Sequence, residues 1–399
     1  MNVLIIAESY LSDNPEDYAG VFIHRQSLAL SKLGYDFRVI NPQPLFSKRI
    51  FSKYYPYESK RDSIVIYRPR FVYFPKIIKL GKTYDFFYSK AVNAVFKSII
   101  SSWKPDVVIC DWIIPGGYAA YVISTRMNLP LIIRARGSDV RFLVKQSSKL
   151  KDYYRQIGDQ AKLVICNGLG LKKDLLNSGI FDQNKIMVIP NGLDTDYFRP
   201  PLENERHSSR SQLGIPIEAQ VWLFVGTWAE HKGTKEISFV IPELMEKFPD
   251  VYFLVAGKII DQNSYNKFQN VQGRTKFLGT LSTEQIIKCY HASDLYVLPS
   301  HMEGLPNTLL EAMSCAIASI ASSVGGIPSL IEDGVNGLLI NKQSKDMLKK
   351  SLSLCYENKK LRIKLGKEAR ETIINNGYGM NNVISELNNL FVLLTQSNS

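Results

Sequence analysis

Short apolar runs alternate with stretches of helical spacing along the first half of the chain. The apolar runs predict strands at 3–7, 37–41, 106–110, 130–134, 162–166 and 186–190. The stretches between them predict amphipathic helices at 22–33, 84–102, 118–126 and 169–178. Strands that alternate with helices at this period predict a parallel sheet that is covered by helices on both faces.

The second half of the chain repeats the pattern. Its apolar runs predict strands at 222–226, 252–256, 276–279, 295–299, 318–322 and 337–340. Two Rossmann-like α/β domains in tandem follow, with a boundary in the turn-rich segment 191–201. The polar residues 203–212 show no periodicity and predict a linker, whereas 380–394 carry an apolar stripe and predict a terminal helix.

The composition is that of a soluble globular protein. With 399 residues, 45% of them hydrophobic and 22% charged, the chain can form two domains that each bury a core. The five cysteines are odd in number and scattered through apolar segments, which favours reduced buried thiols over disulfides or a metal site. The N-terminus lacks a basic region, and no apolar stretch approaches the roughly 18–20 residues of a membrane-spanning helix. We therefore expect a cytoplasmic protein.

The positive charge is concentrated in one segment. Residues 47–104 hold 13 basic against 3 acidic residues, which is +10 of the total net charge of +12, together with fourteen aromatic residues. Basic and aromatic side chains together suit an anionic membrane surface, so we expect peripheral binding to the inner face of the cytoplasmic membrane. The alternative is a solvated face above ordinary core aromatics. Nucleic acid is disfavoured, because no nucleic-acid motif accompanies the segment.

Two glutamates eight positions apart mark the candidate site. Glu303 follows the apolar strand predicted at 295–299, and Glu311 lies in the helix that comes next. The carboxyl end of such a strand is where open α/β sheets bind ligands. The first amides of the helix, from Gly304 to Thr308, carry partial positive charge that suits a phosphate. Carboxylates for sugar hydroxyls beside amides for phosphates indicate a nucleotide-sugar site.

This pair resembles the paired glutamates of the retaining GT-B glycosyltransferases of family four. Further segments resemble landmarks of that family in the same order, so that the resemblance covers nearly the whole chain: 189–194, 226–233, 277–279, 292–295 and 324–328. It implies an α/β fold of the GT-B type, in which two Rossmann-like domains face each other across a cleft and a C-terminal helix returns to the N-domain. Residues 1–196 with the crossing-back helix 380–399 would bind the acceptor, and residues 197–379 the nucleotide sugar.

The resemblance also assigns roles in the second domain. Lys232 would neutralise the diphosphate leaving group, Glu311 would hold the ribose hydroxyls, and Glu303 would face the transferred sugar and act in catalysis with Lys232. The family usually has an arginine where this chain has Thr227, which removes one expected phosphate contact. The donor-binding residues implied in this way are Gly20, Gly226, Thr227, Lys232, Gly304, Leu305, Asn307, Thr308 and Glu311.

In the first domain, the resemblance points to three residues. Gly20 opens the first helix and would face the donor phosphates. Arg136 stands where relatives often have histidine. Because arginine stays protonated, it cannot be a general base, and a charged acceptor or the donor phosphate is its expected partner. We count Arg136 as both catalytic and acceptor-binding. Asp139 is an acceptor ligand or, equally, a helix cap.

No metal or other cofactor is expected. The Asp194-Thr195-Asp196 sequence matches the Asp-x-Asp metal motif of the other glycosyltransferase fold, yet it lies in the predicted interdomain turn. Lys232 and the helix amides already supply positive charge, and no histidine or cysteine cluster has metal-ligand spacing.

Together these features predict a retaining glycosyltransferase. It would move a hexose from a UDP- or GDP-sugar to an acceptor hydroxyl, on a glycan or lipid-linked intermediate of cell-envelope polysaccharide biosynthesis. A nucleotide-sugar epimerase or hydrolase of the same fold is one alternative, and would consume the donor without an acceptor. A non-catalytic membrane- or glycan-binding protein is the other, and would not need both glutamates and Lys232.

Overall fold

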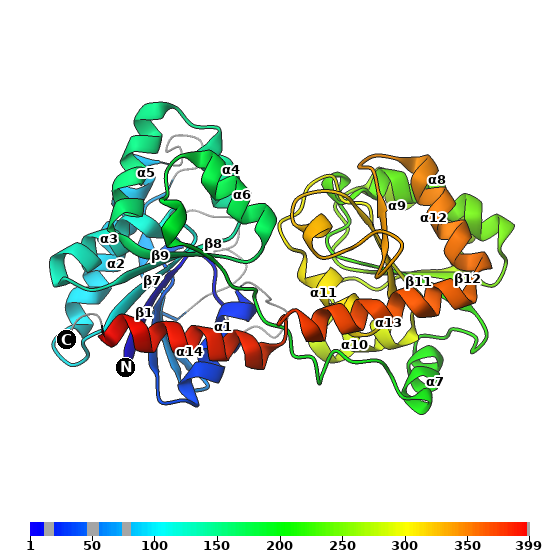
Figure 1. The fold of residues 1–399 in the computed structure, drawn as a ribbon, viewed down its shortest axis with the longest axis horizontal. Helices are drawn as coiled ribbons and strands as arrows, with labels where there is room; N and C mark the ends of the chain where they lie inside the picture. The colour runs from blue at the N-terminus through cyan, green and yellow to red at the C-terminus, as the bar shows by residue number, and fades with distance from the viewer. Residues whose placement is uncertain (12–19, 46–55, 74–80, 397–399) are drawn as a thin grey trace. The chain divides into compact units, whose positions relative to one another are not determined.

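The computed structural model describes residues 1–11, 20–45, 56–73 and 81–396. The chain forms two compact units, one of residues 1–192 with 381–399 and the other of residues 193–380 (Figure 1). We call them unit 1 and unit 2. The sequence placed the boundary after residue 196, four residues later than the structure does.

Unit 1 contains a sheet of eight strands in the order β10-β9-β8-β7-β1-β2-β5-β4, in which only the pairing of β4 with β5 is antiparallel. The strands are β1 (Asn2–Ala7), β2 (Asp36–Ile40), β4 (Glu58–Arg61), β5 (Ile64–Tyr67), β7 (Val107–Asp111), β8 (Leu131–Ala135), β9 (Ala161–Cys166) and β10 (Ile186–Val188). A separate pair joins β3 (Gln43–Pro44) to β6 (Arg70–Phe71). The prediction missed β3 to β6, which lie in or near the basic segment and are four residues long or shorter.

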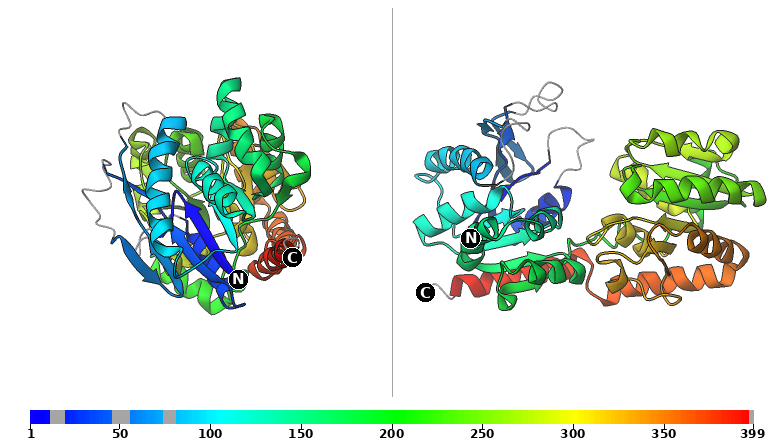
Figure 2. Two further views of the ribbon diagram at one scale, coloured as in Figure 1. Left: turned by 90° about the vertical axis from the view of Figure 1, so that its left-hand side faces the viewer. Right: turned by 90° about the horizontal axis from the view of Figure 1, so that it is seen from above.

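Helices cover both faces of this sheet (Figure 1, Figure 2). They are α1 (Val21–Ser31), α2 (Lys82–Ile99), α3 (Gly116–Met127), α4 (Ser138–Val144), α5 (Ser148–Gln160), α6 (Leu169–Ser178) and α14 (Met380–Gln396). Side chains of a strand alternate between faces, so each strand contributes to two apolar layers. Leu4 and Ile6 join the core formed with α2 and α3, whereas Ile5 faces α1 and α14.

The terminal helix α14 belongs to unit 1, as the resemblance implies. Its side chains Leu387 and Phe391 line a small apolar space with Ile5 and Phe37 of the sheet. The hydroxyl of Tyr35 donates to Asn388 Oδ1 at 2.7 Å. The apolar stripe read from the sequence is therefore the face that docks on the sheet.

Unit 2 contains a parallel sheet of six strands in the order β13-β12-β11-β14-β15-β16. The strands are β11 (Gln220–Val225), β12 (Val251–Ala256), β13 (Thr275–Phe277), β14 (Leu295–Leu298), β15 (Ala318–Ser322) and β16 (Leu338–Ile340), each at its predicted place. The main helices are α8 (Thr234–Lys247), α9 (Gln262–Asn266), α10 (Thr283–Ala292), α11 (Asn307–Ser314), α12 (Lys345–Glu357) and α13 (Lys359–Asn375).

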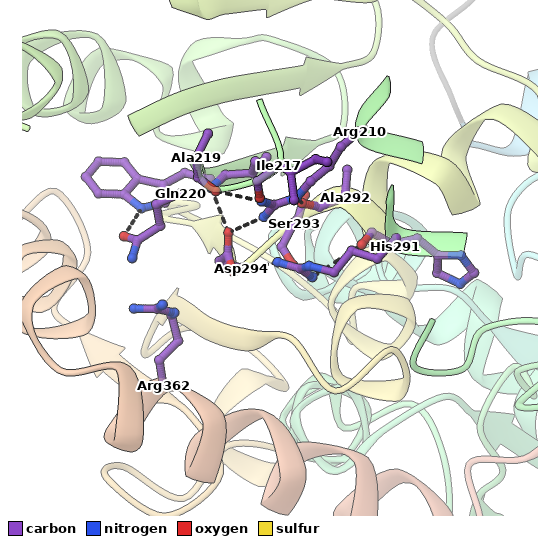
Figure 3. A network of polar contacts seen from close by, with 12 residues as sticks. Arg210, Ile217, Ala219, Gln220, His291, Ala292, Ser293, Asp294 and Arg362 are labelled. Atoms are coloured by element: carbon purple, nitrogen blue, oxygen red, sulfur yellow. Dashed lines mark hydrogen bonds and ion pairs between the residues drawn. The ribbon is translucent and has the colours of Figure 1, made fainter. Parts of the chain in front are cut away.

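The predicted linker 203–212 is wrong, because these residues form helix α7 (Glu203–Gln212). The helix has no apolar stripe and docks through two arginines instead, of which Arg210 is labelled in Figure 3. Arg206 and Arg210 donate to the two carboxylate oxygens of Asp294 at 2.7 and 2.8 Å. Arg210, buried, also donates to the carbonyls of Ala219 and Ala292. Hydrophobic periodicity cannot report a helix that is held by charge.

Two expectations about the chain concern cysteines and membrane spans. All five cysteines are buried free thiols, as the sequence predicted. In the part of the chain that the structure describes, no helix has the length and apolar content needed to cross a bilayer.

Candidate functional site

Both sheets reverse their strand order at one place. In unit 2 the chain runs outward from β11 through β12 to β13, then returns to start again at β14 on the other side of β11. In unit 1 the same reversal lies between β1 and β7. Loops diverge at the carboxyl ends of the two central strands at such a switch point, and this is where open α/β sheets bind ligands.

The switch point of unit 2 is built by backbones in close contact. A Cβ on Gly233 would lie 2.1 Å from the carbonyl oxygen of Pro299, and one on Gly325 would lie 1.9 Å from that of Glu303. His301 N–H donates to the His231 carbonyl at 2.9 Å, which ties the loop after β14 to the loop after β11. Glycine is therefore required for the packing of these loops, which fixes the backbone around Lys232 and Glu303.

Lys232 and Glu303 meet at this point. The ammonium of Lys232 lies 2.7 Å from Glu303 Oε1, and Ser300 Oγ donates to the same oxygen at 2.7 Å. The Glu303 side chain is 8% exposed and that of Lys232 is 23% exposed. The lysine is therefore the more accessible partner, and its flexible stem allows the ammonium to move toward an anion.

Glu311 lies in α11 beside two buried tyrosines. Tyr290 donates its hydroxyl to Glu311 Oε2 at 2.8 Å, and Tyr296 donates to Thr308 Oγ1 at 2.7 Å. Burial is the main cause that raises the pKa of both tyrosines, and the carboxylate of Glu311 raises that of Tyr290 further. Both phenols therefore stay neutral donors at physiological pH, and they orient one side of Glu311 and Thr308.

The expected row of amides before α11 needs a correction. Pro306 lies within it and has no N–H, so the amides from Gly304 to Thr308 are not a continuous row. Leu305 is buried in the core of unit 2, which leaves only its backbone for a ligand. Gly304 and Asn307 are half-buried at the start of the helix.

The loop after β11 carries the other predicted donor residues. Gly226 has a φ of +148°, and its carbonyl would lie 1.9 Å from a Cβ on Gly257. Thr227 is half-buried, and the next residue, Trp228, is fully buried among aromatic rings that include Phe224 and Phe277. The aromatic anchor holds Thr227 at the edge of the sheet.

Unit 1 also has an ion pair at its switch point. Asp111, at the end of β7, is 0% exposed and pairs with Arg136, whose Nε donates to Oδ1 at 2.7 Å. Arg134 Nη1 lies 3.5 Å from the other carboxylate oxygen, and Arg136 Nη1 also donates to Asn191 Oδ1 at 2.8 Å. The Arg136 side chain is only 8% exposed. The guanidinium expected to meet a charged ligand is thus held by the protein itself.

Asp139 is also committed to the fold. Its carboxylate accepts from the backbone N–H groups of Ile113, Arg136, Gly137 and Val140, and it is buried at the start of α4. Burial raises its pKa, and the four amides oppose that rise. The sequence left two roles open for Asp139, an acceptor ligand or a helix cap, and this geometry matches the helix cap.

Gly20 opens α1 with a φ of +72°, and a Cβ there would lie 2.5 Å from the carbonyl of Ser9. Tyr10, three residues after β1, is held by a chain of side chains. The Tyr10 hydroxyl lies 3.0 Å from His24 Nδ1, and His24 Nε2 lies 2.8 Å from Asp62. Burial lowers the pKa of His24, which Asp62 opposes. The backbone packing at Gly20 therefore requires glycine, whether or not this residue faces the donor phosphates.

Several residues of these sites escaped the sequence reasoning. Asp111, Ser300 and Tyr290 were not singled out, although Asp111 ends an apolar run in the way that site carboxylates often do. Ser300 and Tyr290 gave no comparable signal, because their roles depend on which helices and loops pack together.

The Asp-x-Asp motif lies in a turn. Asp194 Oδ1 accepts from the N–H groups of Asp196 and Tyr197 at 3.2 and 2.9 Å. Within the described residues no group of three or more histidine, cysteine or acidic side chains has the arrangement of a metal site.

The basic segment contains both buried and exposed aromatic rings, and it has exposed lysines on α2. The part of the chain that the structure describes does not include Lys48, Arg49, Lys53, Tyr54 or Tyr55. Among the described aromatics, Phe71, Tyr84 and Tyr88 are core residues, whereas Tyr57 and Phe86 are 53% and 48% exposed. On α2, the side chains of Lys82, Phe86, Lys90 and Lys97 are exposed at helical spacing.

Comparisons with known proteins agree with this geometry. Residues 19–197 match the model of the Glycosyltransferase Family 4, and residues 205–372 match the model of the Glycosyl transferases group 1. The structure resembles that of sucrose-phosphate synthase from Thermosynechococcus elongatus with a TM-score of 0.79 and 17% identity, over 99% of both chains. It also resembles Anabaena HepE in complex with UDP and glucose, with a TM-score of 0.74 and 17% identity over 98% of this chain and 99% of that one. The fold is therefore that of the GT-B glycosyltransferases.

Relatives by sequence point the same way. The chain is 28% identical over 371 residues, 90% of each chain, to the putative teichuronic acid biosynthesis glycosyltransferase TuaC of Bacillus subtilis. It is 28% identical over 224 residues to a D-inositol 3-phosphate glycosyltransferase of Corynebacterium aurimucosum, a match that spans 54% of this chain and 53% of that relative. The chain belongs to the group 1 glycosyltransferases.

Proposed function

We propose that the protein is a retaining glycosyltransferase that moves a hexose from a UDP- or GDP-sugar to a hydroxyl of a lipid-linked glycan during cell-envelope polysaccharide assembly. The observation that supports this most is the meeting of Lys232, Glu303 and Ser300 at the switch point of unit 2, with Glu311 on the helix that follows. The ammonium of Lys232 would bind the diphosphate, and the carboxylates of Glu303 and Glu311 beside it would bind hydroxyl groups.

The charges suggest how the donor binds. A diphosphate competes with Glu303 for the ammonium of Lys232, because it carries more negative charge than one carboxylate. Glu303, released from the lysine, accepts hydrogen bonds from the hydroxyls of the sugar. Glu311, oriented by Tyr290, accepts from the ribose diol.

The reaction balances without a protein nucleophile. The bond from the anomeric carbon to the β-phosphate oxygen breaks, and the acceptor oxygen forms its bond on the same face of the sugar. The acceptor proton passes to the departing phosphate oxygen, and Lys232 stabilises the negative charge that develops on the diphosphate. The configuration at the anomeric carbon is retained.

This scheme requires no metal ion. Lys232 supplies the positive charge, and Asp194 is engaged by the amides of its own turn. We expect transfer to persist in EDTA. Activity that EDTA abolishes and that manganese or magnesium restores would contradict this proposal.

The names of two relatives guide the choice of substrates. TuaC is named for teichuronic acid biosynthesis, which supports a cell-envelope acceptor, and HepE was solved with UDP and glucose, which supports a uridine donor. The exposed lysines of α2 supply a basic face for peripheral docking on the inner face of the cytoplasmic membrane, where a lipid-linked acceptor would reside.

The direct test is a thermal-shift screen of UDP- and GDP-sugars, followed by mass spectrometry of products formed on lipid-linked and free glycans. A glycosyltransferase yields an acceptor heavier by one hexose and the free nucleoside diphosphate. Donor consumed at the same rate without acceptor would support the epimerase or hydrolase alternative. Binding without turnover would support the non-catalytic one.

A further inference from the structure

Trp112 follows β7 in a backbone conformation that a bulky residue rarely adopts. Its φ is +70°, in the left-handed region, where a non-glycine residue is strained. Three hydrogen bonds fix it there. Its N–H donates to the Arg134 carbonyl at 3.1 Å, its carbonyl accepts from Cys110 Sγ at 2.8 Å, and the next amide, that of Ile113, donates to Asp139 at 2.8 Å. Strain held in this way is concentrated at ligand sites.

The position of Trp112 also points to a ligand. It lies at the carboxyl end of β7, beside the reversal of strand order between β1 and β7. Its side chain is half-buried and is not part of the hydrophobic core of unit 1. Arg136 contacts this ring and a second one: its guanidinium carbon lies 5.9 Å from the Trp112 centroid and 4.3 Å from that of Phe22, which is also half-buried.

The surrounding arginines are paired inside the protein. Arg134 and Arg136 both lie beside Asp111, and all three side chains are buried or nearly so. Burial lowers the pKa of Arg134 to about 10, so it remains cationic at neutral pH and needs its counterion. Arg136 donates to Asp111 and Asn191 and is only 8% exposed, so a phosphate or carboxylate would have to displace these partners to reach it. An aromatic face beside a neutralised guanidinium suits the C–H face of an uncharged sugar ring.

We propose that the indole of Trp112 is a platform on which a neutral pyranose ring of the acceptor stacks. This inference rests on the proposed function, because it assigns acceptor binding to unit 1. It names the part of the acceptor that is recognised: an uncharged sugar ring rather than a phosphate or a uronic acid.

Intrinsic fluorescence tests the platform without any donor. Of the four tryptophans, Trp103, Trp222 and Trp228 are 6%, 0% and 0% exposed, so acrylamide quenching reports mainly on Trp112. The ligands are the methyl glycosides of glucose, galactose and mannose at high millimolar concentration. We expect at least one of them to protect Trp112 from quenching by acrylamide. The methyl glucuronide should protect Trp112 much less. Trp112→Phe should abolish the change. No protection by any neutral glycoside, or stronger protection by the glucuronide, would overturn the proposal.

Kinetics with the protecting glycoside as acceptor separate binding from folding. Trp112→Gly removes the ring and relieves the left-handed backbone, so the variant should fold. We expect its acceptor KM to rise about 3- to 10-fold with little change in kcat, and Trp112→Phe to recover part of the loss. An unchanged KM would overturn the platform. Titration of both variants with UDP and GDP should match wild type. If the wild-type protein bound neither UDP nor GDP, the proposed function would fail. The fluorescence experiment would still decide whether Trp112 binds a sugar ring.

Discussion

The two units place an acid and a base at the same point of the same kind of sheet, but they hold the pair differently. In unit 2, Lys232 is 23% exposed, and Glu303 accepts from that lysine and from Ser300. In unit 1, Asp111 is fully buried between two arginines, and Arg136 has Asn191 as a further partner. A partly exposed pair can open for a ligand, whereas a buried pair that loses one member leaves an uncompensated charge. We therefore expect the same topology to carry a ligand-binding pair in unit 2 and a structural pair in unit 1.

The largest effect is expected from breaking the buried pair. Asp111→Asn should leave Arg134 and Arg136 without their main counterion and destabilise the protein by about 3–5 kcal/mol. Thermal or denaturant unfolding measures this. Asp152→Asn is the matched control, because Asp152 forms an exposed pair with Arg155 in the same unit and should contribute at most about 0.5 kcal/mol. If Asp111→Asn and Asp152→Asn lowered the free energy of unfolding by the same small amount, Asp111 would not have this structural role.

Replacing the acid of the other pair should affect turnover and spare stability. Glu303→Gln keeps the shape but weakens the contact to the sugar as charge develops in the transition state. We expect kcat to fall about 10²- to 10³-fold, with an unfolding temperature close to that of wild type. The measurement is product formation under saturating donor. A loss of stability as large as that of Asp111→Asn would remove the contrast between the units.

Glu311 should act on donor affinity. Glu311→Gln replaces two charge-assisted hydrogen bonds to the ribose by neutral ones, which is expected to cost about 1.5–3 kcal/mol of nucleotide binding. Isothermal titration with UDP and GDP measures the change. Glu357→Gln, at an exposed surface pair of the same unit, is the control. Unchanged affinity in the Glu311 variant would contradict the ribose assignment.

The smallest effect per residue concerns the membrane. Lys82, Lys90 and Lys97 lie on the exposed face of α2 and should each contribute about 1 kcal/mol to binding of anionic liposomes at low salt. Their replacement by glutamine should reduce co-sedimentation, and high salt should do the same in wild type. The control variant changes three exposed lysines of unit 2 to glutamine: Lys342, Lys350 and Lys364. Equal binding by both variants, or by neutral and anionic liposomes, would contradict docking through α2.

Periodicity was enough to predict the framework of both units. Every predicted strand appears, because fully buried parallel strands leave continuous apolar runs such as 107–110 and 295–298. Helix α7 was missed because Arg206 and Arg210 hold it through Asp294 rather than through an apolar stripe.

The site was predictable only in part. The order of motifs drew attention to Lys232, Glu303 and Glu311, but not to the pairing of the first two, which lie 71 residues apart in sequence. Arg136 was expected to meet a ligand because it stands where relatives often have histidine. Its pairing with Asp111, on another strand and 25 residues away, could not be predicted from the sequence. The left-handed backbone of Trp112 left no signal at all, since it arises from contacts with Arg134, Cys110 and Asp139.

The central claim is that Lys232 leaves Glu303 to bind the donor diphosphate, and titration of UDP and GDP into two variants tests it most directly. Lys232→Met should weaken binding about tenfold or more, because the charge-assisted contact is lost. Glu303→Gln should preserve or increase affinity, because the lysine no longer has to break an ion pair. Lys349→Met and Glu243→Gln, the two halves of a surface pair in the same unit, should leave affinity unchanged. Equal losses of affinity in Lys232→Met and Glu303→Gln would contradict the account, since the pair would then be as structural as that of Asp111 and Arg136.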